Sequence, residues 1–215
     1  MTDYPNTTTD VTAAFPAALR DDAASVAAVL PAWHPYRMSA GVVTFRMVGE
    51  ELRFPYRWYP DEVDRAAYRS LSSVQRAILD CWYTRHHDGR VRQRSLARIL
   101  DCEHPWAAPF VIRPVGEYVI EIVRMIATVV STTEWWRDRS ETYGRFLAED
   151  REFFASVAAR AVSYWDCYHR GDHALFSRYP GGVVVERLRE AANRFTDTPL
   201  PHNVPRERRS PSGRA

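Results

Sequence analysis

Apolar residues with helical spacing follow Pro114, and this segment constrains the fold more than any other feature of the chain. The positions recur every three or four residues: Val115, Val119, Ile122, Val123, Ile126 and Val130. This spacing places the side chains on one face of an α-helix. The polar residues between them form only a narrow stripe, so we expect a largely buried, central helix over these residues.

Further helical patterns lie before and after this segment. Ser72 stands three residues before Gln75, which is the spacing of a capping box and predicts a helix start. Between residues 42 and 58 the pattern is different, because apolar and polar residues alternate on both sides of Gly49, as in a β-hairpin. We therefore predict a mainly α fold, a multi-helix bundle or short helical-hairpin array, with an N-terminal β-hairpin at about residues 42–58.

The length of 215 residues fits one domain. Residues 1–20 are predicted to be a flexible N-terminal segment, and residues 21–195 the single helical domain. The tail, residues 196–215, is rich in proline, serine and arginine and is expected to be disordered.

One part of this domain resembles a known group of proteins. The stretch from Gln75-Arg76-Ala77-Ile78-Leu79 to Val119-Ile120-Glu121-Ile122 is similar to an uncharacterised bacterial all-helical family with HEAT-like packing. The resemblance covers roughly a quarter of the chain. It implies helical packing, and it brings no activity and no site residues with it.

All 29 basic residues are arginine, and this composition excludes several functions. Without lysine there is no Schiff-base catalysis and no P-loop lysine. A net charge of +2 does not point to nucleic acid or an anionic membrane. The chain has no glycine-rich phosphate loop, no signal peptide and no apolar run of about 20 residues, so we expect no cofactor, no membrane and a cytoplasmic location.

Arg90, Arg94 and Arg98 form an arginine stripe, because they are four residues apart on a predicted helix. With Arg85 and Trp106 nearby, the stripe suggests a surface for an acidic partner. The other interpretation is the solvated face of an amphipathic helix. Residues 71–79 and 95–100 resemble the first helices of sigma-type DNA-binding domains. Prolines 105, 109 and 114 interrupt the segment that would read bases, so nucleic acid is not the expected partner.

Glu117 and Glu121 stand one turn apart on the predicted central helix. Repulsion and desolvation would raise the pKa of one carboxyl, as a general acid or base requires. The other interpretation is ion pairing with Arg113 or Arg124. His169 and His173 have a metal-ligand spacing without an accompanying carboxylate motif, so no metal site is predicted.

Two functions remain open after these exclusions. The preferred prediction is a non-catalytic helical interaction or scaffold protein that binds an acidic surface of another protein. Its predicted binding residues are Arg85, Arg90, Arg94, Arg98 and Trp106. The alternative is a small enzyme whose acid–base site uses Glu117 or Glu121.

Overall fold

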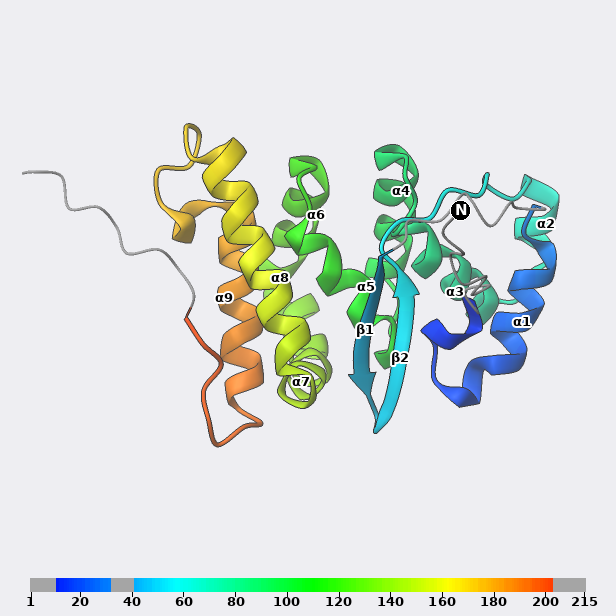
Figure 1. Cartoon of the computed structure of the whole chain (residues 1–215), viewed down its shortest axis with the longest axis horizontal. Coiled ribbons are helices and arrows are strands. Elements are labelled where there is room, and N and C mark those ends of the chain that lie inside the picture. The colour runs from blue at the N-terminus through cyan, green and yellow to red at the C-terminus, as the bar shows by residue number, and fades with distance from the viewer. Residues whose placement is uncertain (1–10, 32–40, 203–215) are drawn as a thin grey trace, which may run out of the picture.

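The computed structural model describes residues 11–31 and 41–202, and this part of the chain is mainly helical with one antiparallel hairpin, as predicted. In Figure 1 the hairpin crosses the middle of an elongated molecule. The first helices lie on one side of it, and the last helices lie on the other. The predicted fold class is therefore confirmed.

The elements before and after the hairpin have the following bounds. The first group comprises η1 (Val11–Ala14), η2 (Ala17–Leu19), α1 (Arg20–Val29), β1 (Val42–Met47), β2 (Glu50–Pro55), α2 (Arg65–Ser70), α3 (Ser73–Tyr83) and α4 (Gly89–Leu100). The second comprises η4 (Pro105–Ala107), α5 (Ala108–Ile112), η5 (Arg113–Gly116), α6 (Ile120–Ser131), α7 (Thr133–Glu149), α8 (Arg151–Tyr164), the π-helical η6 (Trp165–His169), η7 (Phe176–Arg178) and α9 (Pro180–Asn193).

The hairpin turns at Val48 and Gly49, whose φ angles are 53° and 75°. Positive φ at both positions is the geometry of a two-residue hairpin turn, and it matches the twist of the strands. Carboxylates at the end of α7 hold the outer edge of β1. Asp150 accepts from the Arg46 N–H at 2.7 Å, and Glu149 accepts from the Gly49 N–H at 2.8 Å. The hairpin is thus fixed against the C-terminal helices.

The predicted capping box at the start of α3 is present. The Ser72 hydroxyl accepts from the Gln75 N–H at 3.1 Å, and the Gln75 side chain accepts from the Ser72 N–H at 3.0 Å. The Gln75 amide also donates to Asp22 at 2.9 Å. The cap therefore starts α3 and also joins it to α1.

The central helix starts later than predicted. Residues 113–116 form a 3₁₀ turn, Glu117 is extended, and α6 begins at Ile120. Gly116 lies against α8, where a Cβ atom would be 3.0 Å from the Arg160 Cβ and 3.1 Å from the Val157 carbonyl oxygen. The Arg160 Nε also donates to the Gly116 carbonyl at 3.0 Å. This tertiary packing overrides the apolar periodicity before residue 120.

Buried residues lie beyond both ends of the predicted domain, residues 21–195. Val11 and Phe15 are buried, and the Phe15 ring stacks on Phe110 with centroids 5.2 Å apart, so these two residues belong to the core. At the other end Leu200 is 2 % exposed, and its N–H donates to the Asn193 side chain at 2.8 Å. The rest of the predicted flexible segments, residues 1–10 and 203–215, lies outside the described residues.

Gly144 in the middle of α7 allows α9 to approach closely. A Cβ atom at Gly144 would be 2.5 Å from the carbonyl oxygen of Ala191. Alanine normally stabilises a helix interior by about 1 kcal/mol relative to glycine. We expect the opposite sign for Gly144→Ala, a loss of roughly 1–3 kcal/mol in the free energy of unfolding, because the added methyl group would overpack this contact.

Gly171→Ala is the matched control, since nothing lies within 4 Å of a Cβ atom at this exposed position. Urea unfolding should show a change within about 0.5 kcal/mol for the control. A stabilised Gly144→Ala variant would contradict the close approach of α7 and α9.

Candidate functional site

Glu117 is 2 % exposed and is surrounded by arginine side chains. Arg57 donates two hydrogen bonds to its carboxylate, at 2.9 and 2.7 Å. The Arg85 Nη1 donates a third at 3.1 Å, and the Arg92 Nη2 stands 3.9 Å away. Burial by itself would raise the pKa of Glu117, but the hydrogen bonds from Arg57 and the charges of all three arginines outweigh it and lower the pKa to about 2. Glu117 is therefore ionised.

Backbone hydrogen bonds bring Arg57 and Arg85 together. The Trp58 N–H donates to the Arg85 carbonyl at 2.8 Å, and the His87 N–H donates to the Trp58 carbonyl at 2.7 Å. Arg92 comes from the first turn of α4, and its Nη1 donates to the carbonyls of His86 and His87 at 2.8 and 2.9 Å. The segment after β2 and the turn between α3 and α4 thus converge on Glu117.

Four arginines, including Arg57 and Arg85, gather around the ring of Tyr56. The guanidinium carbon lies 5.4 Å from the ring centroid for Arg57, 5.7 Å for Arg85, 5.9 Å for Arg113 and 5.1 Å for Arg160. Together with Arg92 these residues form what we call the arginine cluster. It comprises Arg57, Arg85, Arg92, Arg113 and Arg160.

Among the described residues, positive charge in the arginine cluster exceeds negative charge. In residues 11–31 and 41–202, Glu117 is the carboxylate that pairs with the cluster, through Arg57, Arg85 and Arg92, and no ion pair there involves Arg113 or Arg160. Burial lowers the pKa of Arg85 to about 10, with the charges of Arg57 and Arg113 adding to the effect and that of Glu117 opposing it. Burial also lowers the pKa of Arg113, and the charge of Arg160 adds to that shift.

Several N–H groups of the cluster also lack acceptors. The buried Nε of Arg85 and the buried Nε and Nη2 of Arg92 have no hydrogen-bond partner within the described ranges. A buried donor without an acceptor costs about 1–3 kcal/mol. The cluster therefore combines unpaired positive charge with unused hydrogen-bond donors among the described residues.

A row of three tyrosine rings lies beside the arginine cluster, and we call it the tyrosine row. Tyr118 and Tyr168 are 52 % and 69 % exposed, and the Tyr164 ring lies between them at 6.1 and 6.0 Å. The Arg160 guanidinium is 5.3 Å from the Tyr164 ring, and that of Arg92 is 5.9 Å from the Tyr118 ring. The cluster thus continues into an open aromatic surface.

The predicted binding residues do not form one surface. Arg85 is 1 % exposed and belongs to the cluster. In the arginine stripe, Arg94 pairs with Glu62 at 2.7 Å and Arg98 with Asp80 at 2.9 Å, and Arg90 is exposed. Their partners come from elements distant in the sequence, which is why the helical spacing did not show that two of these charges are already paired.

Trp106 is half-buried rather than part of an open surface. Its ring packs edge-on against Phe15 at 5.6 Å, and His104 stacks on it at 5.0 Å. Phe15 lies in a segment that was predicted to be flexible, so this packing could not be expected from the sequence.

The predicted carboxylate pair is also separated. Glu121 lies exposed in the first turn of α6, while Glu117 is buried in the extended segment before that helix. The expected raised pKa is contradicted, since that of Glu117 is lowered. The ion-pair interpretation was correct in kind, but the partners are Arg57 and Arg85 instead of Arg113 or Arg124. Arg57 and Arg160 were not predicted as site residues, because their neighbours in the chain form no pattern that indicates a binding site.

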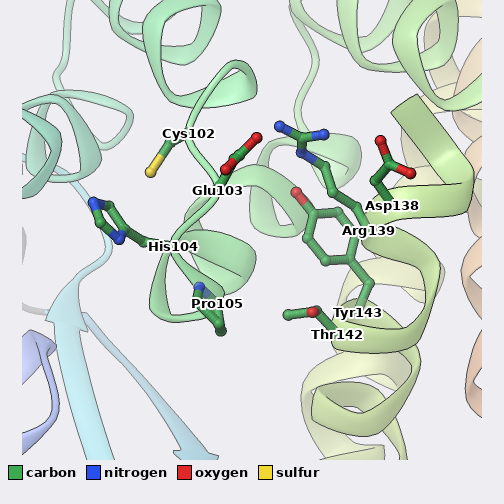
Figure 2. Close-up of a pocket in the computed structure, with 8 residues that line it drawn as sticks. All are labelled: Cys102, Glu103, His104, Pro105, Asp138, Arg139, Thr142 and Tyr143. Carbon is green, nitrogen blue, oxygen red and sulfur yellow. The ribbon is translucent and has the colours of Figure 1, made fainter. Parts of the chain in front are cut away.

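A cavity of about 280 Å³ lies between the turn after α4 and helix α7 (Figure 2). Cys102, which is followed by Glu103 and His104 in the sequence, lines it. Burial raises the pKa of the Cys102 thiol, although a hydrogen bond from the His104 backbone and the charge of Arg139 oppose this shift. The thiol is therefore protonated at neutral pH, which is unfavourable for a nucleophile.

His169 and His173 lie against the Tyr179 ring, at centroid distances of 5.4 and 5.7 Å. Among the residues that the structure describes, no three His, Cys, Asp or Glu side chains come together as metal ligands. In the same part of the chain, no helix combines the length and the apolar character that crossing a membrane requires.

Comparison of the chain with protein-family models, with curated proteins and with solved structures finds no match. The function must therefore be inferred from the geometry and charge of the site.

Proposed function

We propose that this protein is a non-catalytic interaction protein that binds an acidic segment of a partner protein at the arginine cluster. One observation carries the proposal: five guanidinium groups converge on Tyr56 and Glu117, and within the described ranges Glu117 is the one carboxylate paired with them. The proposal keeps the predicted class of function and moves the binding surface from the arginine stripe to the cluster.

Electrostatics supports an acidic ligand at this place. Buried charges without partners are costly, and an added carboxylate would offset that cost through charge-assisted hydrogen bonds. Arg57 and Arg160 carry the charge of the cluster toward the surface, since both are only partly buried. Arginine forks bind carboxylates in bidentate geometry, as Arg57 already binds Glu117.

The tyrosine row supports a protein partner. Tyrosine and arginine are enriched at the centres of protein interfaces, and exposed tyrosine rings supply contact area at a low entropic cost. Tyr118 and Tyr168 offer such rings next to the charged site. A partner segment with acidic residues would thus contact charge and aromatic surface together.

A labelled oligoglutamate peptide tests the proposal by fluorescence anisotropy. We expect binding that weakens with salt, because the contacts are electrostatic. Arg160→Gln should weaken it about tenfold or more, the equivalent of roughly 1.4 kcal/mol for one charged contact. Arg90→Gln and Arg94→Gln on α4 are the matched controls and should bind like the wild type.

Three outcomes would overturn the proposal. The first is a peptide that does not bind, and the second is a loss of binding in the α4 variants with Arg160→Gln unchanged. The third is tighter binding of a single-stranded oligonucleotide of equal charge, which would favour stacking of bases on the tyrosine row. Thermal unfolding of each variant verifies that it is folded.

A further inference from the structure

The cavity shown in Figure 2 lies apart from the arginine cluster and has walls from two elements. Cys102, Glu103, His104 and Pro105 line it from the turn after α4. Asp138, Arg139, Thr142 and Tyr143 line it from one face of α7. The Trp135 indole of α7 donates to the Leu100 carbonyl at the end of α4 at 2.9 Å, so the two walls are fixed relative to each other.

Groups of opposite charge face this cavity without pairing with each other. In the described part of the chain, Glu103 forms no ion pair, and Arg139 pairs with neither Glu103 nor Asp138. The buried Nε of Arg139 has no acceptor, and its guanidinium is held 4.9 Å from the Trp135 ring centroid. Asp138 pairs instead with Arg137 at 3.1 Å. The cavity separates a cation from an anion that would otherwise attract it.

Tyr143 adds a hydrogen-bonding group beside Arg139. Its hydroxyl points into the cavity between Arg139 and Glu103 in Figure 2 and has no hydrogen-bond partner among the described residues. Burial raises the pKa of Tyr143, with the Arg139 charge opposing the shift, so the hydroxyl keeps its proton and can donate.

We propose that this cavity binds a small zwitterion, a free α-amino acid, between Arg139 and Glu103. Arg139 and the Tyr143 hydroxyl receive the carboxylate, and Glu103 receives the ammonium group. The volume of about 280 Å³ suits a ligand of this size, because it lies just below the range of roughly 300–1,000 Å³ for sites that bind drug-sized molecules.

The arrangement of charge argues against other small ligands. A dianion would be repelled by Glu103 and Asp138, and a diamine would be repelled by Arg139. An apolar molecule would leave the Arg139 Nε and the Tyr143 hydroxyl without partners. A ligand that carries an ammonium and a carboxylate group on one carbon satisfies the two walls at once.

The test is a thermal-shift screen of the full chain against each standard amino acid, followed by calorimetry with the best binder. We expect that binder to lose at least tenfold in affinity when its ammonium is acetylated, and again when its carboxylate is converted to the amide. Arg139→Gln and Glu103→Gln should each weaken binding at least tenfold, and Tyr143→Phe severalfold.

Two variants on the exposed face of the same helix provide the controls. Glu141 and Arg145 pair with each other at 2.9 Å on the outer face of α7, so Glu141→Gln and Arg145→Gln should bind like the wild type. The proposal is overturned if no amino acid raises the melting temperature at its solubility limit. It is equally overturned if binding survives in both Arg139→Gln and Glu103→Gln while both variants melt like the wild type.

Discussion

Replacing Glu117 with glutamine is expected to destabilise the protein by about 3–5 kcal/mol, the cost of leaving buried charges uncompensated. Glutamine has the shape of glutamate, so the effect comes from the charge and not from a cavity. The variant would retain the guanidinium groups of Arg57 and Arg85 next to a neutral amide, where they now lie 2.7 and 3.1 Å from the carboxylate oxygens. Urea unfolding at pH 7 measures the change.

Glu121→Gln is the matched control for this variant. Glu121 is exposed in the first turn of α6, so its free energy of unfolding should change by no more than about 0.5 kcal/mol. Equal effects of the two substitutions would contradict the placement of Glu117 at the centre of the arginine cluster.

Acid should destabilise the protein through the same carboxyl group. The pKa of Glu117 is about 2 in the folded protein against an ordinary value of 4.5 for a glutamate side chain, so its charge stabilises the fold above pH 4.5. This contribution is lost as the pH falls from 4.5 toward 2, because only the unfolded chain takes up the proton at first. The shift corresponds to about 3 kcal/mol.

The Glu117→Gln variant isolates this contribution from that of other carboxyl groups. Protonated glutamate and glutamine are both neutral, so the free energies of unfolding of the two proteins should converge as the pH approaches 2. Parallel pH profiles for the wild type and the variant would show that Glu117 titrates normally.

Local signals in the sequence were sufficient to predict much of the fold. The capping box at Ser72 and Gln75, the alternation around Gly49 and the apolar face of α6 after Ile120 each involve neighbours a few residues apart. Where the prediction was wrong, a distant partner decided the structure. Gly116 leaves the helical pattern because α8 packs against it, and Phe15 belongs to the core because its ring stacks on Phe110.

The candidate site was harder to predict for the same reason. Glu117 was predicted as a candidate site residue because it is acidic and lies in an apolar stretch. Its partners Arg57 and Arg85 are 60 and 32 positions away in the sequence. Arg98 was predicted to bind a partner, but it is paired with Asp80, 18 positions away in the sequence. An arginine-rich sequence shows that guanidinium groups are abundant, and only the fold shows which of them lack a carboxylate.

Urea unfolding of Arg113→Met, with and without the oligoglutamate peptide, tests most directly whether the arginine cluster carries surplus charge for an acidic partner. Arg113 is 5 % exposed, and its one hydrogen bond in the described part of the chain goes to Ser156 at 2.9 Å. If its charge is surplus, the variant without peptide should be as stable as the wild type or more stable by about 1–4 kcal/mol. The peptide should then stabilise the wild type more than the variant. A variant that is strongly destabilised without peptide, together with a wild type that the peptide does not stabilise, would contradict this account.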